Sequence, residues 1–252
     1  MSLGRPLLWH LPISHFSEKV RWAFDWKRVP HRRRVMPPGL HPFGGLLLTG
    51  GRSFTMPVLV HDDGRRVDDS TAIIEWLEET SPSRSLYPAD PAERARALAL
   101  EEWFDENVGP HARRWAFNAL LTEPEALRAF AVKQTEWAPF AVPTDLFAPL
   151  AKLFLNVRYS TEDEAGVEEA RGKLAGGLDR LEAELDGGSR EFLVGNRFTV
   201  ADLTAAALFY PLVLPPQGPW EPVRTAAFDE FQSSVRDRPG FRWVEETFRR
   251  WR

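Results

Sequence analysis

The first residue whose type and position could support chemistry is Ser14. It stands where the apolar run 6–11, typical of a strand, gives way to helical spacing of apolar residues. A hydroxyl at that junction lies beside the unsatisfied N–H groups of the first helical turn, which carry partial positive charge and suit an anion. Serine is also a favoured N-cap residue, so capping alone is the competing explanation.

A second candidate is the dipeptide Met56-Pro57, at the expected start of a strand. Proline cannot donate a hydrogen bond to a sheet ladder, so here it marks an edge or a special turn. If the Met56–Pro57 bond is cis, the backbone N–H and C=O of Met56 turn outward and can bind an extended peptide. A trans proline that merely begins a strand is the alternative.

The third candidate is Asp69-Ser70, at a predicted helix start. The N–H groups of that start, together with the Ser70 hydroxyl, can hold a carboxylate, and Asp69 can accept from an ammonium group. The pair would then bind an amino-acid zwitterion. A helix that is simply capped by Asp69 is again the alternative.

A further motif is structural. Thr199 and Asp202 have the spacing of a capping box, with Asp in place of the usual Glu, and Phe198 and Leu203 stand at the positions of a hydrophobic staple. We assign no chemistry to it.

The elements that must position these residues follow a β-α-β-β-β-α order. Strands are predicted at 6–11, 31–36, 57–60 and 66–67, the last two joined by an Asp-Asp-Gly turn. A helix is predicted from Ser14, with Glu18, Lys19 and Asp25 facing water, and another from about Ser70. The glycine-rich segment 37–55 is predicted to be irregular where a second helix would normally sit.

Beyond a Pro/Ser-rich stretch the strand signals disappear. A helical stripe runs from Ala97 to Val108, and helices are predicted over 124–140, 164–186, 199–213 and 225–236. The expected organisation is an α/β domain at 1–81, a linker at 82–92 and an all-α domain at 93–252.

Composition excludes several classes of function. With 32 basic and 36 acidic residues, the net charge of -4 gives no general attraction for nucleic acid or an anionic membrane. The absence of cysteine excludes disulfides, thiolate metal sites and catalysis by the protein's own sulfur. The six histidines have no metal-site spacing, so no metal is expected. No signal peptide or membrane span is recognised, and a cytoplasmic location is expected.

The ordered set of motifs resembles the glutathione transferase superfamily over essentially the whole chain, in its cytosolic, bacterial-like form with a serine-type active site. Asp69-Ser-Thr-Ala-Ile73 is similar to the family's Glu/Asp-Ser-x-Ala-Ile motif, Met56-Pro57 to its cis-proline motif, and Thr199-x-x-Asp202 to its capping box. The resemblance implies a thioredoxin-like N-terminal domain that binds glutathione and an all-helical C-terminal domain that contributes the electrophile site.

The resemblance also implies roles. Ser14 matches the serine that hydrogen-bonds the glutathione sulfur, and Met56, followed by Pro57, would pair with the cysteinyl unit. Asp69 and Ser70 would hold the γ-glutamyl end. Glutathione, or another small thiol, would be a co-substrate beside a small hydrophobic electrophile, without a metal, in a homodimer with a detoxifying role.

The sequence departs from the family pattern at several points. Trp9 and His10 stand where tyrosine-type members carry the catalytic Tyr, and His15 follows Ser14 where many members have Pro. The basic partner of the glycine carboxylate is open between His41 and Arg52. Candidate aromatic residues for the electrophile site are Trp103, Trp115, Phe117 and Trp137.

The expected reaction is attack by a thiolate. Making a thiol mostly ionised near neutrality requires about 2.7 kcal/mol, and a hydrogen bond from Ser14 to the sulfur anion can supply roughly 1.5–3 kcal/mol. The alternative function is a non-catalytic carrier or interaction protein that keeps the fold. A serine hydrolase is disfavoured because no Gly-x-Ser-x-Gly elbow occurs.

Overall fold

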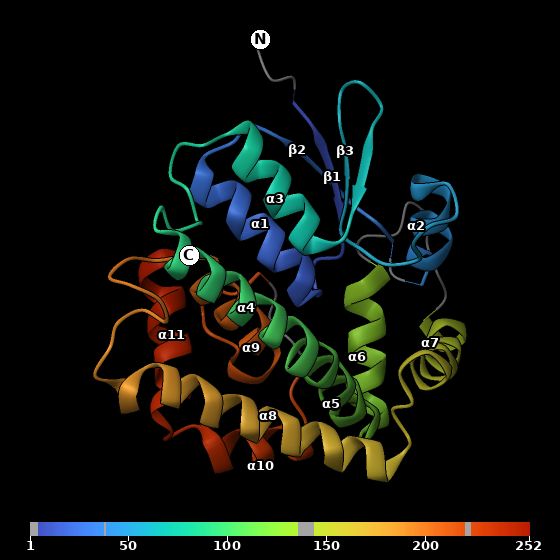
Figure 1. Ribbon diagram of the computed structural model, residues 1–252. Helices are drawn as coiled ribbons and strands as arrows, with labels where there is room; N and C mark the ends of the chain where they lie inside the picture. Colours follow the sequence, from blue (N-terminus) through green and yellow to red (C-terminus); the bar gives the residue numbers. More distant parts are fainter. Residues whose placement is uncertain (1–4, 38, 136–143, 220–222) are drawn as a thin grey trace.

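The computed structural model describes residues 5–37, 39–135, 144–219 and 223–252. Its first part is a mixed four-stranded sheet with three helices (Figure 1). The strands are β1 (Leu7–His10), β2 (Arg32–Val35), β3 (Val58–Val60) and β4 (Arg66–Asp68), and the helices are α1 (His15–Lys27), α2 (His41–Thr49) and α3 (Ser70–Thr80). The predicted order of strands and helices is confirmed, apart from α2.

The sheet has the order β2-β1-β3-β4, with β1 parallel to β2 and antiparallel to β3. Trp9 at the end of β1 pairs with Val58 at the start of β3, and Val58 pairs with Asp68 at the end of β4. Neighbouring strands lie about 4.8 Å apart. The segments that leave β1, enter β3 and leave β4 therefore emerge side by side at one end of the strands.

The prediction of an irregular segment over 37–55 is wrong, because α2 occupies its middle. Two of the glycines that suggested a loop, Gly44 and Gly45, are packing sites within α2. A Cβ atom on Gly44 would lie 2.4 Å from the Met36 side chain, and one on Gly45 would lie 2.9 Å from the Phe54 backbone. Glycine is thus required for close approach within a helix.

The rest of the described chain is helical. Its elements are α4 (Pro91–Asn107), α5 (Gly109–Leu121), α6 (Pro124–Thr135), α7 (Thr144–Tyr159), α8 (Glu164–Glu184), the short 3₁₀ helix η1 (Asp186–Gly188), α9 (Val200–Val213), α10 (Ala226–Val235) and α11 (Pro239–Trp251). Within the described ranges, no helix combines the length and the hydrophobicity needed to cross a membrane, and no cluster of three or more potential metal ligands occurs.

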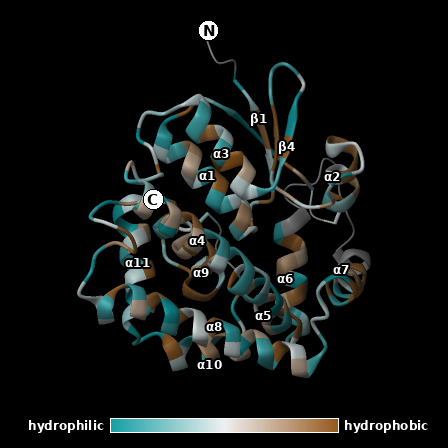
Figure 2. Ribbon diagram, in the orientation of Figure 1, coloured by the Kyte–Doolittle hydropathy of each residue, from teal (hydrophilic) through white to brown (hydrophobic). Residues whose placement is uncertain are grey.

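Helix α9 is the centre of the core. Almost every residue of α9 is buried, and it contacts α1, α4, α5 and α11. The predicted capping box at its start is present: Thr199 N–H and Oγ1 each donate to Asp202 Oδ2 at 2.8 Å, and Leu193 N–H donates to Asp202 Oδ1 at 2.8 Å. The tip of the β3–β4 hairpin, by contrast, is hydrophilic (Figure 2).

Helix α1 joins the two parts of the molecule. The Trp22 side chain is 1% exposed, and its ring lies 4.7 Å from that of Phe248 and 5.8 Å from that of Phe198 between centroids. Its indole N–H donates to the Trp251 carbonyl at 3.0 Å. The core therefore runs continuously from the sheet domain into the helical domain.

Candidate functional site

Ser14 is the N-cap residue of α1, as the capping alternative requires. Its backbone is extended (φ -80°, ψ 123°), and its Oγ accepts a hydrogen bond from Ser17 N–H at 3.2 Å. Because the hydroxyl acts only as an acceptor among the described residues, its own hydrogen is free to be donated. Capping and donation to a ligand are therefore compatible.

His15 anchors this helix start to the helical domain. Its ring is buried, and Nε2 lies 2.8 Å from the carbonyl oxygen of Gly109 in α5. A carbonyl can only accept, so Nε2 carries the hydrogen. Burial, assisted by the charge of Arg113, lowers the pKa of His15 to about 3, and the imidazole is neutral. A residue that departs from the family pattern thus has a structural role here.

Met56 and Pro57 are joined by a cis peptide bond. The Met56 side chain is buried, and it packs with Leu11, Met36 and Val58. Outside the strand ladders, the Met56 backbone makes no hydrogen bond with a described residue.

Asp69 and Ser70 begin α3. Asp69 has a positive φ of 89°, and its Oδ1 accepts from Thr71 N–H at 2.9 Å and from Ala72 N–H at 3.1 Å. The capping alternative is therefore realised by one oxygen only, and Oδ2 accepts from no described residue. The buried Ser70 hydroxyl likewise makes no hydrogen bond with a described residue.

A buried ionic cluster beside Ser70 was not anticipated from the sequence. Lys19 Nζ lies 2.8 Å from Glu101 Oε1, 2.5 Å from Asp105 Oδ2 and 3.1 Å from Thr71 Oγ1. The prediction that Glu18 and Lys19 face water is wrong, since both are fully buried, whereas Asp25 is exposed as expected. The cause is the helical domain, which covers a face of α1 that would be solvated in an isolated first domain.

This cluster leaves two acceptors without partners. Glu101 Oε2 and Asp105 Oδ1 are buried and accept no hydrogen bond. Burial raises the pKa of Glu101, although the ammonium of Lys19 opposes the shift. One cation thus faces two carboxylates, and the surplus negative charge lies next to the start of α3.

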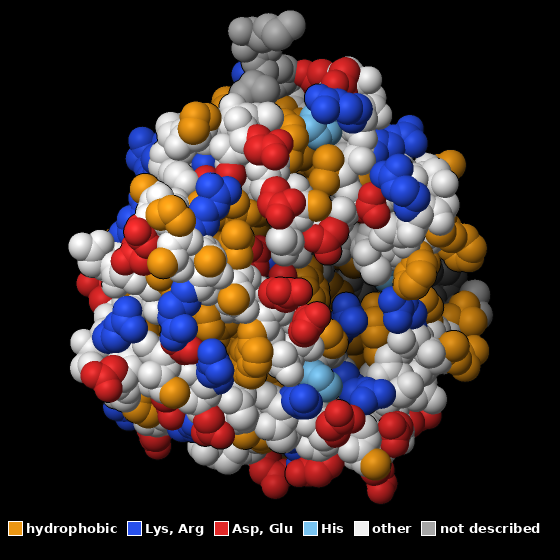
Figure 3. All heavy atoms as spheres, viewed as in Figure 1, with side chains coloured by type: hydrophobic (Ala, Val, Ile, Leu, Met, Phe, Trp, Pro, Cys, Tyr) orange, Lys and Arg blue, Asp and Glu red, His pale blue; other side chains and the backbone are white. Residues whose placement is uncertain are grey.

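A second group of aromatic and basic side chains gathers where α5 and the end of α7 approach the start of α2. Arg113 of α5 lies over the ring of Tyr159, with Cζ 4.6 Å from its centroid, and Arg158 Cζ lies 5.1 Å from the same centroid. His41 at the start of α2 faces this group, and burial together with Arg158 and Arg113 lowers its pKa to about 4. In Figure 3 the surface is hollowed to the right of centre, where hydrophobic and basic side chains surround the hollow.

The aromatic candidates for an electrophile site have different outcomes. Phe117 stacks on Tyr159 with 5.5 Å between ring centroids, beside Arg113 and Arg158. Trp115 is fully buried against Phe228 and Phe231, and Trp103 packs on the core. Trp137 lies outside the described residues.

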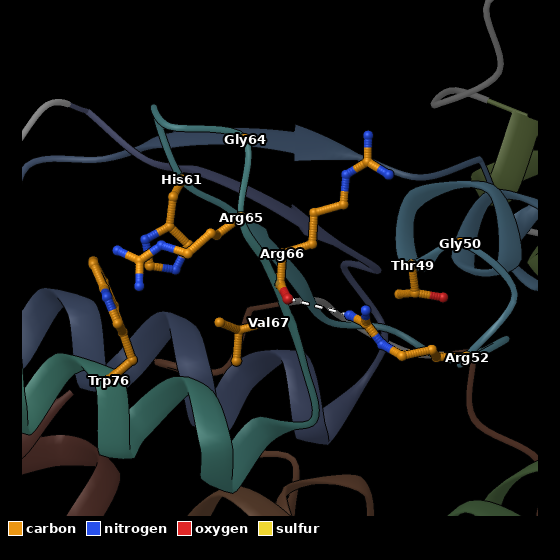
Figure 4. Close-up of a pocket in the computed structure, with 9 residues that line it drawn as sticks. All are labelled: Thr49, Gly50, Arg52, His61, Gly64, Arg65, Arg66, Val67 and Trp76. Atoms are coloured by element: carbon orange, nitrogen blue, oxygen red, sulfur yellow. Dashed lines mark hydrogen bonds between the residues drawn. The ribbon is translucent and has the colours of Figure 1, made fainter.

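A separate depression of about 690 Å³ lies on the β3–β4 hairpin (Figure 4). His61, Arg65 and Trp76 lie at one end, and Arg52 and Arg66 at the other. Arg52 is bound to Asp68 at 2.9 Å and to the Arg66 carbonyl at 3.2 Å. Of the predicted site residues, Arg52, a candidate for the glycine carboxylate, lines this depression. The other candidate, His41, lies near Arg113 and Arg158 instead.

We expect stability to fall as the pH decreases from about 7.5 to about 5.5. The buried His10 and His15 have folded-state pKa values of about 3, and His41 has one of about 4, all below the ordinary 6.5, so the unfolded chain takes up their protons first. Protonation of each of these histidines in the unfolded chain should lower the free energy of unfolding by about 1.4 kcal/mol over this interval. Asp202, whose pKa burial raises to about 6, offsets less than about 1 kcal/mol.

Urea denaturation at both pH values measures this loss. His15→Gln should remove about 1.4 kcal/mol of this loss, because glutamine does not titrate. An unchanged pH dependence in that variant would contradict the assignment of a neutral, buried His15.

The fold and the site define a protein with a thioredoxin-like N-terminal domain joined to an all-helical domain. The comparisons agree. The family model "Glutathione S-transferase, N-terminal domain" matches residues 8–85, and "Glutathione S-transferase, C-terminal domain" matches residues 164–232. The chain belongs to the glutathione transferase superfamily, as its motifs predicted.

Its relatives have varied names. FtsZ-localized protein A from Caulobacter vibrioides is 28% identical over 96% of this chain and 91% of its own length. A probable maleylacetoacetate isomerase from Caenorhabditis elegans is 27% identical over 83% of this chain and 80% of its own. A solved glutathione S-transferase from Rhodospirillum rubrum F11 shares the fold, with a TM-score of 0.60, 24% identity and coverage of 95% and 91%.

Proposed function

We propose that the protein is a glutathione-dependent transferase in which Ser14 stabilises the thiolate of bound glutathione. The observation that carries the proposal is the strand register. It brings the segments that carry the Ser14 hydroxyl, the cis Met56–Pro57 bond and the Asp69–Ser70 helix start to the same end of the strands.

The ends of the tripeptide would find complementary groups. The N–H groups at the start of α3 and the free Ser70 hydroxyl suit the γ-glutamyl carboxylate. Asp69 Oδ2, which accepts from no described residue, suits its ammonium group. The outward backbone of Met56 would pair with the cysteinyl unit by strand addition.

The sulfur would then lie at the start of α1. The free hydrogen of Ser14 can be donated to a thiolate, and the N-terminus of a helix favours negative charge by about 0.3–1 kcal/mol. With roughly 1.5–3 kcal/mol from the hydrogen bond, the sum meets the roughly 2.7 kcal/mol that ionisation near neutrality requires. Ser14 acts as a donor, and the bound sulfur is the nucleophile.

The second candidate is a non-catalytic carrier or interaction protein. Similarity to FtsZ-localized protein A over nearly the whole chain favours it. Such a protein could keep the site residues without turnover. The family resemblance also predicts a homodimer and a cytoplasmic location, to be tested by sedimentation and by microscopy.

Calorimetric titration with glutathione tests the proposal. We expect saturable binding, a large loss of affinity for the dipeptide Cys-Gly, which lacks the γ-glutamyl end, and about a tenfold weaker affinity in Ser70→Ala. Ser234→Ala, at an exposed serine of α10, is the matched control and should bind as the wild type does. Equal affinity for glutathione and Cys-Gly would overturn the proposed site, and binding without turnover of any electrophile would favour the carrier.

A further inference from the structure

Two arginines beside Tyr159, Arg113 and Arg158, lack the carboxylate partners that the buried cations have. Lys19, Lys27, Arg21 and Arg252 are each paired with at least one Asp or Glu. By contrast, neither Arg113 nor Arg158 forms an ion pair or a hydrogen bond with a described residue, and Arg113 Nε is sealed from solvent without a partner. An unpaired charge in a half-buried position is unfavourable unless something compensates it.

The two guanidinium groups flank one aromatic ring. Arg113 lies over Tyr159 from α5, and Arg158 lies over both Tyr159 and Phe54, at 5.1 and 4.9 Å from their centroids. The Tyr159 carbonyl accepts from Arg114 Nε at 3.0 Å, which fixes the end of α7 against α5. The site is therefore a pair of cations held on a rigid aromatic wall.

This wall lies next to Ser14. Arg113 is four residues after Gly109, so both occupy one face of α5, and the Gly109 carbonyl is bound by His15. The charge of Arg113 reaches His15, and on the other side of Ser14 the Ile13 side chain packs against the small α5–α6 cluster, as Phe117 does. Ser14 thus lies between a residue bound to the helix that carries Arg113 and a residue that packs on the cluster formed by that helix and α6.

We propose that Arg113 and Arg158 bind the carboxylate of an anionic electrophile, whose apolar part packs on Tyr159 and Phe117. The inference rests on the proposed function and specifies its second substrate. In a substitution, the thiolate sulfur bonds to carbon while the halide leaves with the carbon–halogen electron pair. The carboxylate is unchanged, and its role is to orient the electrophile.

An anion here could instead be the glycine carboxylate of glutathione. The geometry favours the carboxylate of the electrophile, because both arginines belong to the helical domain. The predicted tripeptide site, by contrast, lies at the strand ends of the sheet domain. His41, whose buried Nδ1 has no partner, belongs to α2 in the sheet domain and is the candidate for the glycine carboxylate there.

The test compares two synthetic conjugates of glutathione, one with a carboxynitrophenyl group on sulfur and one with the matching carbamoylnitrophenyl group. Calorimetry should show that the wild type binds the acid about 10- to 100-fold more tightly than the amide, as expected for hydrogen bonds to a charged group. Arg113→Gln should abolish most of this preference and leave the affinity for glutathione itself unchanged. Arg158→Gln should give the same pattern independently.

Arg94→Gln is the matched control. Arg94 also lies over a tyrosine, with Cζ 4.9 Å from the Tyr87 centroid, but it stands about 20 Å along α4 from the end that meets α5. It should leave the preference for the acid intact. Because Arg113 has no partner to lose, Arg113→Gln should unfold at the same or a higher temperature than the wild type.

Each other outcome is decisive. Equal affinity for the two conjugates in a wild type that binds glutathione would overturn the inference and leave the proposed function standing. Weaker binding of glutathione itself in Arg113→Gln would assign the arginine to the tripeptide and overturn it as well. If the wild type binds no glutathione, the inference fails together with the proposed function.

Discussion

Lys19→Ala is expected to lower the free energy of unfolding by about 3–5 kcal/mol, the range seen when one partner of a buried ion pair is removed. Lys19 is fully buried and is the cation that faces both Glu101 and Asp105. Without it, two carboxylates lie in the core beside each other with only Thr71 Oγ1 as a donor. Urea denaturation near pH 7.5 measures the loss.

Two comparisons make this prediction specific. Lys152→Ala removes an exposed pair, with Glu162 at 3.0 Å, and should cost less than about 1 kcal/mol. The loss in Lys19→Ala should also shrink at lower pH, because burial raises the pKa of Glu101 and protonation of this carboxyl removes the repulsion. A loss as small as that of Lys152→Ala would mean that water reaches the cluster.

Ser14→Ala is expected to reduce turnover near neutral pH by about 10- to 100-fold, the equivalent of one hydrogen bond to a charged sulfur. The pKa of the bound thiol should rise accordingly, while the affinity for glutathione changes little. The thiolate absorbance of the complex, followed as a function of pH, measures this pKa directly. Loss of the N-cap should cost about 1 kcal/mol of stability as well.

Ser14→Thr is the control, because it retains both the hydroxyl and the cap. It should restore the low thiol pKa, whereas a purely structural role for Ser14 would leave the thiol pKa the same in all three proteins. If the Ala variant keeps the pH profile of the wild type, Ser14 has no part in activating the thiol.

The features that the sequence predicted well are those with local causes. Ser14 and Asp69 cap helices through their own side chains, and the box at Thr199 and Asp202 closes over a separation of three residues. The alternation of strands and helices in the first domain, and the helical character of the second, follow from periodicity in short windows.

The features that the sequence did not reveal depend on distant contacts. Lys19 looks like a solvated helix residue until Glu101 and Asp105 are placed beside it, and Gly44 looks like a loop residue until Met36 is packed against it. Arg113 is one of many arginines in the chain, and the fold is needed to show that its buried Nε has no hydrogen-bond partner. Such roles are defined by neighbours that no short window contains.

The packing of Trp22 against Phe198 and Phe248 has a consequence for the folding and unfolding of the protein. The sheet domain and the helical domain are not independently stable, because side chains of each complete the hydrophobic core of the other. Melting should be a single concerted event. A fragment ending near residue 81 would expose the side chains of Trp22 and Lys19, which are buried in the whole chain, and we expect it to aggregate rather than to fold on its own.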